Sequence, residues 1–344
     1  MLLVVLLLVL SAILVTFMNV YSVTVVLYCK KLHKPSHLAV LSLLLGHLIQ
    51  GLIVLPAYAY ERSDVNKSEA TCSVFRFTYL FSNYICCLSV LVISLDRYNA
   101  VQYPLKYKTN FTCKLMSRLL LSMWVYVFLL CLIPFVPSNE HTGQCKYHPQ
   151  KEWVLIMLLG HTMIPFFVII FCYVIIYKKI ISVLRRRDPK SSACQLHEST
   201  RADARTKRVL SVRKQLQKTN VTLIIVLAFF LCRGPSFVYY LLLAVCKEEC
   251  FHNHYYRMFN PNYDESLEKE TVGFFVKYFT LVDGVLSPLI YCTRNCTFSV
   301  ERQNLMKHLK EKIFGKEEVV RYRKKGIVAI GMEDQLADLV NGND

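Results

Sequence analysis

Residues 72–98 read CSVFRFTYLFSNYICCLSVLVISLDRY. Between Arg76 and Asp96 this stretch carries no charged side chain. Its length is close to the roughly 20 residues that a helix needs to cross the hydrocarbon core of a bilayer. An aspartate followed by an arginine closes the run, where a membrane helix would return to water. The stretch therefore predicts a transmembrane helix that ends in a charged pair.

Six further apolar runs of similar length accompany it. The seven candidate spans cover about residues 2–28, 36–59, 72–98, 117–137, 151–180, 217–245 and 271–293. Hydrophobic residues make up 54% of the 344-residue chain, which is more than a soluble domain usually contains. We therefore predict an all-α membrane protein built as a bundle of seven transmembrane helices.

Basic residues between the spans predict the orientation of the bundle. Residues 178–218 hold 13 Lys or Arg against three acids, whereas residues 246–270 hold three against six. Because basic loops stay in the cytoplasm, the N-terminus is expected outside and the C-terminus inside. The first run could be a signal peptide, but its basic residues follow the run rather than precede it. Membrane orientation also explains the net charge of +17 better than nucleic-acid binding does.

Two cysteines and one sequon fall on the predicted outer side. Cys72 opens the third span, and Cys145 lies in the loop after the fourth. A disulfide between them is chemically allowed there, because the outer side is oxidising. In the chain-entropy model, a bridge that closes a loop of this length contributes about 4 kcal/mol. Of the four N-x-[ST] sequons only Asn66 lies outside, so only Asn66 is expected to carry a glycan.

The sequence Asp96-Arg97-Tyr98 resembles the D-R-Y motif of rhodopsin-like (class A) G protein-coupled receptors. Arg97 follows Cys72 by 25 residues, as in that family, and Ser287-Pro288-Leu289-Ile290-Tyr291 resembles N-P-x-x-Y. Further landmarks fall in the expected spans: Asn19, Pro56, Trp124, Pro165, Tyr173, Pro235 and Phe298. The resemblance covers residues 2–310. It implies a plasma-membrane receptor domain at 1–295, an amphipathic eighth helix at 296–310 and a cytoplasmic tail at 311–344.

The resemblance also implies that Arg97 is a switch. A permanent cation near the membrane edge is costly unless it is paired, and Asp96 is its adjacent partner. In the family, the released arginine contacts Tyr173, Tyr291 and the tail of a heterotrimeric G protein. Proline kinks in spans six and seven, the latter at Pro288, would let the inner end of span six swing outward. The alternative interpretation is a static ion pair at the interface and fixed kinks that serve packing.

Residues in the middle of the bundle depart from the family pattern. His47 stands where the family has a sodium-binding acid, Ser287 replaces the usual Asn, and Asn19 is retained. Because sodium prefers oxygen ligands, we expect neither a bound metal nor sodium-dependent modulation. Arg233 replaces the tryptophan of C-W-x-P and would be costly unpaired at that depth. We predict a buried Arg233–Asp283 pair; alternatively Arg233 reaches water and Asp283 pairs with His47.

By resemblance, seven residues line a ligand pocket with aromatic walls and a few polar groups. They are Tyr79, Asn83, Met157, His161, Phe237, Tyr240 and Lys277. Tyr79 occupies the position of the amine-binding acid, and Leu281 that of the retinal-binding lysine. Biogenic amines, retinal and other cofactors are therefore not expected. Lys277 meets either an anionic ligand group or acids of the last outer loop, such as Glu270.

The expected partners follow from this interpretation. They are a heterotrimeric G protein, an unknown extracellular ligand, membrane lipids and arrestin. Arrestin would use the third inner loop, because the tail after Ser299 has no Ser or Thr. No nucleic-acid partner is expected, because membrane orientation accounts for the basic charge. No enzymatic activity is expected, because the sequence shows no His/Asp/Glu cluster with the spacing of metal ligands. The alternatives are a receptor-like protein without G protein signalling and a transporter, although internal repeats are not evident.

Overall fold

A computed structural model describes residues 2–63, 69–133, 156–185, 219–239, 241 and 265–314. Every regular element in these ranges is a helix. The chain divides into two compact units, residues 1–295 and 296–344. The predicted seven-helix fold is confirmed. Seven described helices are long and apolar enough to cross a membrane: Leu2–Tyr28, Pro35–Glu61, Ala70–Gln102, Cys113–Leu132, Ile156–Ser182, Thr219–Tyr239 and Gly273–Arg294.

The first four membrane helices are joined by short connections. The elements are α1 (Leu2–Tyr28), the 3-10 turn η1 (Lys30–Leu32), α2 (Pro35–Ile49), the π-turn η2 (Gln50–Val54), α3 (Leu55–Glu61), α4 (Glu69–Gln102), α5 (Pro104–Asn110) and α6 (Cys113–Leu132). Proline opens α2, α3 and α5 near their first positions, where its missing N–H is not needed. The hydroxyl of Thr112 caps α6 by accepting from the Leu115 amide at 3.2 Å.

The remaining elements follow in chain order. They are the π-turn η4 (Leu159–Met163), α8 (Ile164–Arg185), the Thr219–Tyr239 helix, α11 (Glu265–Arg294) with Pro288 inside it, and α12 (Cys296–Phe314) in the second unit. The sixth span was predicted at 217–245, and its described part, residues 219–239 and 241, is helical. Predicted residues Asn66, Cys145 and Tyr240, and most of the third inner loop, lie outside the described residues.

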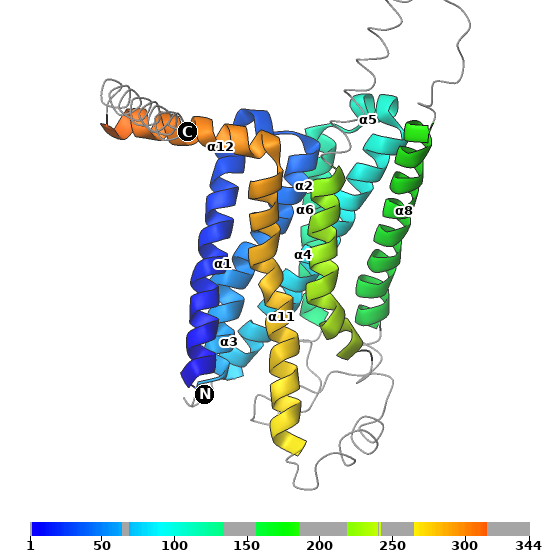
Figure 1. Cartoon of the computed structure of the whole chain (residues 1–344). Coiled ribbons are helices and arrows are strands. Elements are labelled where there is room, and N and C mark those ends of the chain that lie inside the picture. Colours follow the sequence, from blue (N-terminus) through cyan, green and yellow to red (C-terminus); the bar gives the residue numbers. More distant parts are fainter. Residues whose placement is uncertain are drawn as a thin grey trace, which may run out of the picture. The chain divides into compact units, whose positions relative to one another are not determined.

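Apolar side chains point both outward and inward, as expected when lipid is the solvent. Leu2, Phe17 and Leu231 are exposed by 67% or more, and each lies on a membrane helix. Inside the bundle, α4 packs against α2, α6 and α8, while α1 packs against α2, α3 and α11. Figure 1 shows α1 and α11 side by side. This packing brings polar residues from five separate helices into the same interior.

Candidate functional site

Asp96 and Arg97 form a closed pair near the end of α4. Arg97 donates to Asp96 Oδ2 through both Nε, at 3.0 Å, and Nη2. Both residues are at least 95% buried. The Tyr107 hydroxyl donates to the second carboxylate oxygen, Oδ1, at 2.7 Å. Asp96 therefore uses both of its oxygens, one on the arginine and one on a tyrosine of α5.

Tyr107 reaches Asp96 because the chain turns at Tyr103 and Pro104. Pro104 opens α5, which begins two residues after the end of α4. Burial, and the neighbouring Asp96 carboxylate, raise the pKa of Tyr107 above its ordinary value of about 10. The hydroxyl thus stays protonated and donates to Asp96 throughout the physiological pH range.

The other predicted switch residues lie buried in neighbouring helices. His37 Nδ1 on α2 and the Tyr291 hydroxyl on α11 are 2.6 Å apart and buried. The Tyr173 hydroxyl is buried, with Ser94 and Thr222 as polar neighbours. Tyr98 packs edge-on against Tyr103, with ring centroids 6.4 Å apart. Arg97 is thus held by Asp96, while Tyr291 contacts His37 and Tyr173 lies beside Ser94 and Thr222.

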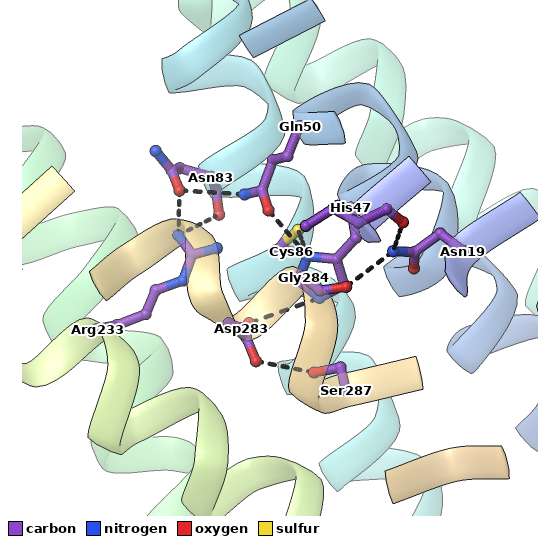
Figure 2. Close-up of polar contacts among 10 residues, drawn as sticks. Asn19, His47, Gln50, Asn83, Cys86, Arg233, Asp283, Gly284 and Ser287 are labelled. Atoms are coloured by element: carbon purple, nitrogen blue, oxygen red, sulfur yellow. Dashed lines mark hydrogen bonds and ion pairs between the residues drawn. The ribbon is translucent and has the colours of Figure 1, made fainter. Parts of the chain in front are cut away.

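A second group of polar side chains lies in the middle of the bundle, as Figure 2 shows. His47, which is fully buried, places Nδ1 3.0 Å from Gln50 Oε1 and 3.6 Å from Cys86 Sγ. Gln50 also donates weakly, at 3.5 Å, to Asn83 Oδ1 on α4. The π-turn η2 begins at Gln50, and such turns often occur at functional positions.

The direct Arg233–Asp283 pair predicted from the sequence is not formed. Instead, Arg233 Nη1 donates to Asn83, to its side-chain oxygen and, at 3.4 Å, to its carbonyl. The guanidinium carbon lies 4.9 Å from the centre of the Phe229 ring. Asp283 Oδ2 lies 3.5 Å from His47 Nε2, and Oδ1 accepts from Ser287 at 2.8 Å. The pairing of Asp283 with His47 is the alternative that the sequence had left open.

This arrangement leaves both charges incompletely satisfied. Arg233 Nε and Nη2 are buried, and neither has a hydrogen-bond partner among the described residues. The same holds for Asp283 Oδ2, whose contact with His47 is long. Figure 2 shows Arg233 turned toward Asn83 and Asp283 turned toward Ser287. Opposite charges on the Thr219–Tyr239 helix and on α11 therefore share one interior without joining.

Asn19 fixes α1 to α11 at the same level. Its side-chain amide donates to the Val15 carbonyl at 2.7 Å and to the Gly284 carbonyl at 2.8 Å. A Cβ at Gly284 would lie 3.1 Å from Val15, so a small residue is needed where the helices approach. Within the described ranges, no group of three or more His, Cys, Asp or Glu side chains could hold a metal ion.

The predicted pocket residues that the structure describes fall into four separate sets. Tyr79 and Lys277 both contact Phe75: the Tyr79 ring lies 5.7 Å away, and the Lys277 ammonium lies 5.7 Å from the ring centre. Asn83 belongs to the network with Arg233. His161 contacts the Tyr126 hydroxyl through Nε2. Met157 is buried and Phe237 half-buried, but no polar contact joins them to the other predicted pocket residues that the structure describes.

Several functional side chains were not found from the sequence. Tyr107 lies 11 residues from Asp96 in the sequence, His37 lies 254 residues from Tyr291, and Gln50 lies 33 residues from Asn83. Trp124 Nε1 donates to Ser42 Oγ at 2.9 Å, and Ser42 lies 2.8 Å from Ser89. By contrast, the sequence did predict a disulfide at Cys72, and Cys72 is disulfide-bonded. The high polarity of His37, Gln50 and Ser42 inside predicted spans was the signal that could have drawn attention to them.

Comparison with known proteins gives a consistent result. A family model described as "7 transmembrane receptor (rhodopsin family)" matches residues 18–261. The probable G-protein coupled receptor No9 of Amphibalanus amphitrite is 29% identical over 48% of this chain and 38% of its own length. Octopamine receptor beta-2R of Chilo suppressalis is 22% identical over 81% of this chain and 73% of its own. The alpha-1A adrenergic receptor of Cavia porcellus is 25% identical over 81% of this chain and 62% of its own length. The chain thus spans less than two thirds of two of these relatives.

Proposed function

Because the chain belongs to the rhodopsin family of seven-transmembrane receptors, we propose that it transmits a signal from an extracellular ligand to a heterotrimeric G protein. The family and the seven apolar helices make it a multi-pass protein of the plasma membrane. Its relatives are receptors rather than enzymes. The N-terminus would lie outside, with Asn66 glycosylated and Cys72 joined to Cys145, and the C-terminus would lie in the cytoplasm.

The observation that carries this proposal is the closed Asp96–Arg97–Tyr107 cluster. Arg97 is a permanent cation. Here it is 5% exposed and donates to the adjacent Asp96 carboxylate. An exposed ion pair contributes little to stability, whereas this pair is buried and therefore holds its two residues in fixed positions. Here a third residue, Tyr107, also holds the carboxylate. Such a cluster fits a resting state in which Arg97 is kept from other partners.

The activating step would release Arg97. When the inner end of the Thr219–Tyr239 helix moves outward, the arginine would turn toward Tyr173 and Tyr291 and toward the G protein tail. Tyr173 offers a buried hydroxyl that is already close enough to Arg97 to interact with its charge. Pro235 lies within the moving helix, where a missing backbone hydrogen bond permits bending. Pro288 does the same for α11.

The ligand would differ from those of the relatives named above. Two of them are named for octopamine and as an adrenergic receptor. In this chain Tyr79 stands where the amine-binding acid of such receptors is expected, and it packs on Phe75. A ligand without a positive charge therefore fits better, whether peptide or small molecule. Arrestin, if it binds, would use the third inner loop.

Heterotrimer dissociation in cells tests this proposal. The chain is expressed with a panel of optical sensors, one for each class of heterotrimeric G protein, and exposed to peptide and metabolite libraries. We expect at least one sensor to respond, and Arg97→Ala to abolish the response at equal surface level. Arg118→Ala, at an exposed position on α6, is the control.

Two results would contradict the proposal. A response unchanged by Arg97→Ala would remove the arginine from the mechanism. Silence of every sensor at normal surface level would favour a receptor-like protein that does not signal, and solute flux through the same cells would favour a transporter.

A further inference from the structure

Arg233 and Asp283 carry opposite charges in the middle of the bundle, and both retain unused bonding capacity (Figure 2). Arg233 donates through Nη1 to Asn83, while its Nε and Nη2 atoms are buried without a hydrogen-bond partner among the described residues. On Asp283, Oδ1 accepts from Ser287 at 2.8 Å, and Oδ2 has only the 3.5 Å contact with His47. The cation thus has donors to spare, and the carboxylate has an acceptor to spare.

The two charges share their neighbours. Arg233 and Asp283 both act through their electric fields on His47 and on the Cys86 thiol. This thiol also lies close enough to Arg233 to serve as an acceptor, but sulfur accepts hydrogen bonds only weakly. Opposite charges attract more strongly in a buried interior than in water, and bonds to a carboxylate are stronger than bonds to a neutral oxygen. Asp283 is therefore a better acceptor for Arg233 than the thiol or the Asn83 amide that it now contacts.

The helix that carries Arg233 is weakened at this residue. Pro235 has no amide hydrogen, so the backbone bond that it would make to the Leu231 carbonyl is missing. Arg233 lies within the turn that lacks this bond. Gly234 follows it, and a Cβ added at Gly234 would meet open space. Because the turn lacks both a hydrogen bond and close packing on that side, a local bend of the helix can re-aim the Arg233 side chain.

We propose that Arg233 exchanges Asn83 for Asp283 when its helix bends. Asp283 would keep the bond that its Oδ1 atom accepts, and it would offer Oδ2 to the guanidinium in place of His47. The Asn83 contact ties the helix of Arg233 to α4, whereas the Asp283 contact would tie the same helix to α11. Assigning the first arrangement to the resting receptor and the second to the activated one rests on the proposed function. The exchange of partners itself does not.

Substitutions at Asn83 should shift the balance between the two arrangements in opposite directions. Asn83→Leu removes the present acceptor, so Arg233 should move to Asp283, although the bend that this requires keeps the variant less stable than wild type. Asn83→Asp replaces a neutral oxygen by a carboxylate, so Arg233 should stay where it is. A static arrangement, in which a water molecule bridges Arg233 and Asp283, predicts the same coupling between these two residues in all three proteins.

Double-mutant cycles on the purified full chain in lipid nanodiscs test the exchange without any G protein. Arg233→Met, Asp283→Asn and their combination are made in wild type, in Asn83→Leu and in Asn83→Asp, and the midpoint of thermal unfolding is measured for each protein. We expect a non-additivity of about 2 °C or less in wild type and Asn83→Asp. In Asn83→Leu it should reach about 5 °C or more, because a buried ion pair has formed.

Ser82→Ala is the matched control background. Ser82 is buried beside Asn83 on α4, and its hydroxyl donates to the Tyr79 carbonyl rather than to Arg233. Its cycle should match that of wild type. Asn83→Ala provides a second removal of the acceptor, should the leucine prevent folding, and it should also increase the coupling. Equal coupling in every background, or a decrease when the Asn83 acceptor is removed, would overturn the exchange.

Basal guanine-nucleotide exchange on purified heterotrimers separates this inference from the proposed function. Asn83→Leu should raise the basal rate up to about tenfold, since a bond to a charged group no longer holds the resting arrangement. Asn83→Asp should lower the rate, and Asp283→Asn should cancel the increase in Asn83→Leu. If the coupling rises as expected but every rate equals that of heterotrimer alone, the partner exchange stands and the proposed function fails. If wild type drives nucleotide exchange but the coupling never changes, the proposed function stands and the partner exchange fails.

Discussion

Arg233 and Asn83 should be energetically coupled, because the amide oxygen of Asn83 is the principal acceptor for the Arg233 guanidinium. Arg233 donates to it through Nη1, while Nε and Nη2 have no partner among the described residues. Asn83→Leu would remove that acceptor at similar volume and leave a buried cation with its Phe229 ring and the long bond to the Asn83 carbonyl.

The size of the effect follows from the chemistry of this contact. A hydrogen bond to a charged group contributes about 1.5–3 kcal/mol, and stranding a buried charge costs at least as much. In Arg233→Met the charge is absent, so Asn83→Leu should then be nearly harmless. The coupling energy between the two substitutions is therefore expected to be about 2 kcal/mol, within the range found for residues in contact.

A double-mutant cycle measures this coupling. Wild type, Asn83→Leu, Arg233→Met and the double variant are purified in nanodiscs and heated at one scan rate with a thiol-reactive dye. Buried thiols such as Cys86, Cys87 and Cys131 report unfolding when they become exposed. At roughly 2–4 °C per kcal/mol, the non-additivity should be about 4 °C or more. Additive shifts would refute the assignment of Asn83 as the acceptor. A larger coupling of Arg233 to Asp283 would instead restore the direct pair.

Three further predictions concern single sites. Tyr107→Phe should raise basal nucleotide exchange up to about tenfold, because Asp96 loses a donor worth about 1.4 kcal/mol or more. In wild type the Tyr107–Asp96 contact should persist below about pH 10 and weaken only as pH rises through the elevated Tyr107 pKa. Increased nucleotide exchange near pH 7, which would indicate loss of the contact, would contradict this expectation. Gly51→Ala should cost about 1–3 kcal/mol and lower surface expression, since its Cβ would lie 2.8 Å from a backbone nitrogen of α1. Gly160→Ala, with open space at the Cβ, is the matched control, and equal losses in both would be inconsistent with a packing effect. Replacing sodium by N-methylglucamine at constant ionic strength should leave signalling unchanged. His47 offers a nitrogen ligand, which sodium does not prefer, and it already contacts Gln50. A sodium-dependent change in signalling would contradict this prediction.

The fold could be predicted from the sequence because lipid imposes a simple rule on helix length and polarity. Each of the seven predicted spans corresponds to a described helix. Helix ends were less predictable. The helix that contains Arg97 continues past Tyr98 to Gln102, because Asn99 to Gln102 keep helical geometry and the chain turns only before Pro104.

The interior of the site was only partly predictable. Asp96 and Arg97 are adjacent in sequence, so their contact needs no knowledge of helix packing. The contact of Arg233 with Asn83 depends on how the Thr219–Tyr239 helix is rotated against α4, which periodicity does not specify. Asp283 lies four residues before Ser287 on one helix face, so that bond could have been anticipated. The orientation of Asp283 toward His47 could not have been anticipated, because it depends on how α11 packs against α2.

The central claim is that Asp96 restrains Arg97 until activation releases the arginine to contact the G protein. Guanine-nucleotide exchange on purified heterotrimers tests this claim. Wild type, Asp96→Asn and Arg97→Ala are compared in nanodiscs at equal receptor concentration. Asp96→Asn should raise the basal rate by roughly tenfold, since a charge-assisted contact worth about 1.5 kcal/mol or more is lost. Arg97→Ala should reduce the rate to that of heterotrimer alone. Equal rates for all three proteins, with each one folded, would contradict the account.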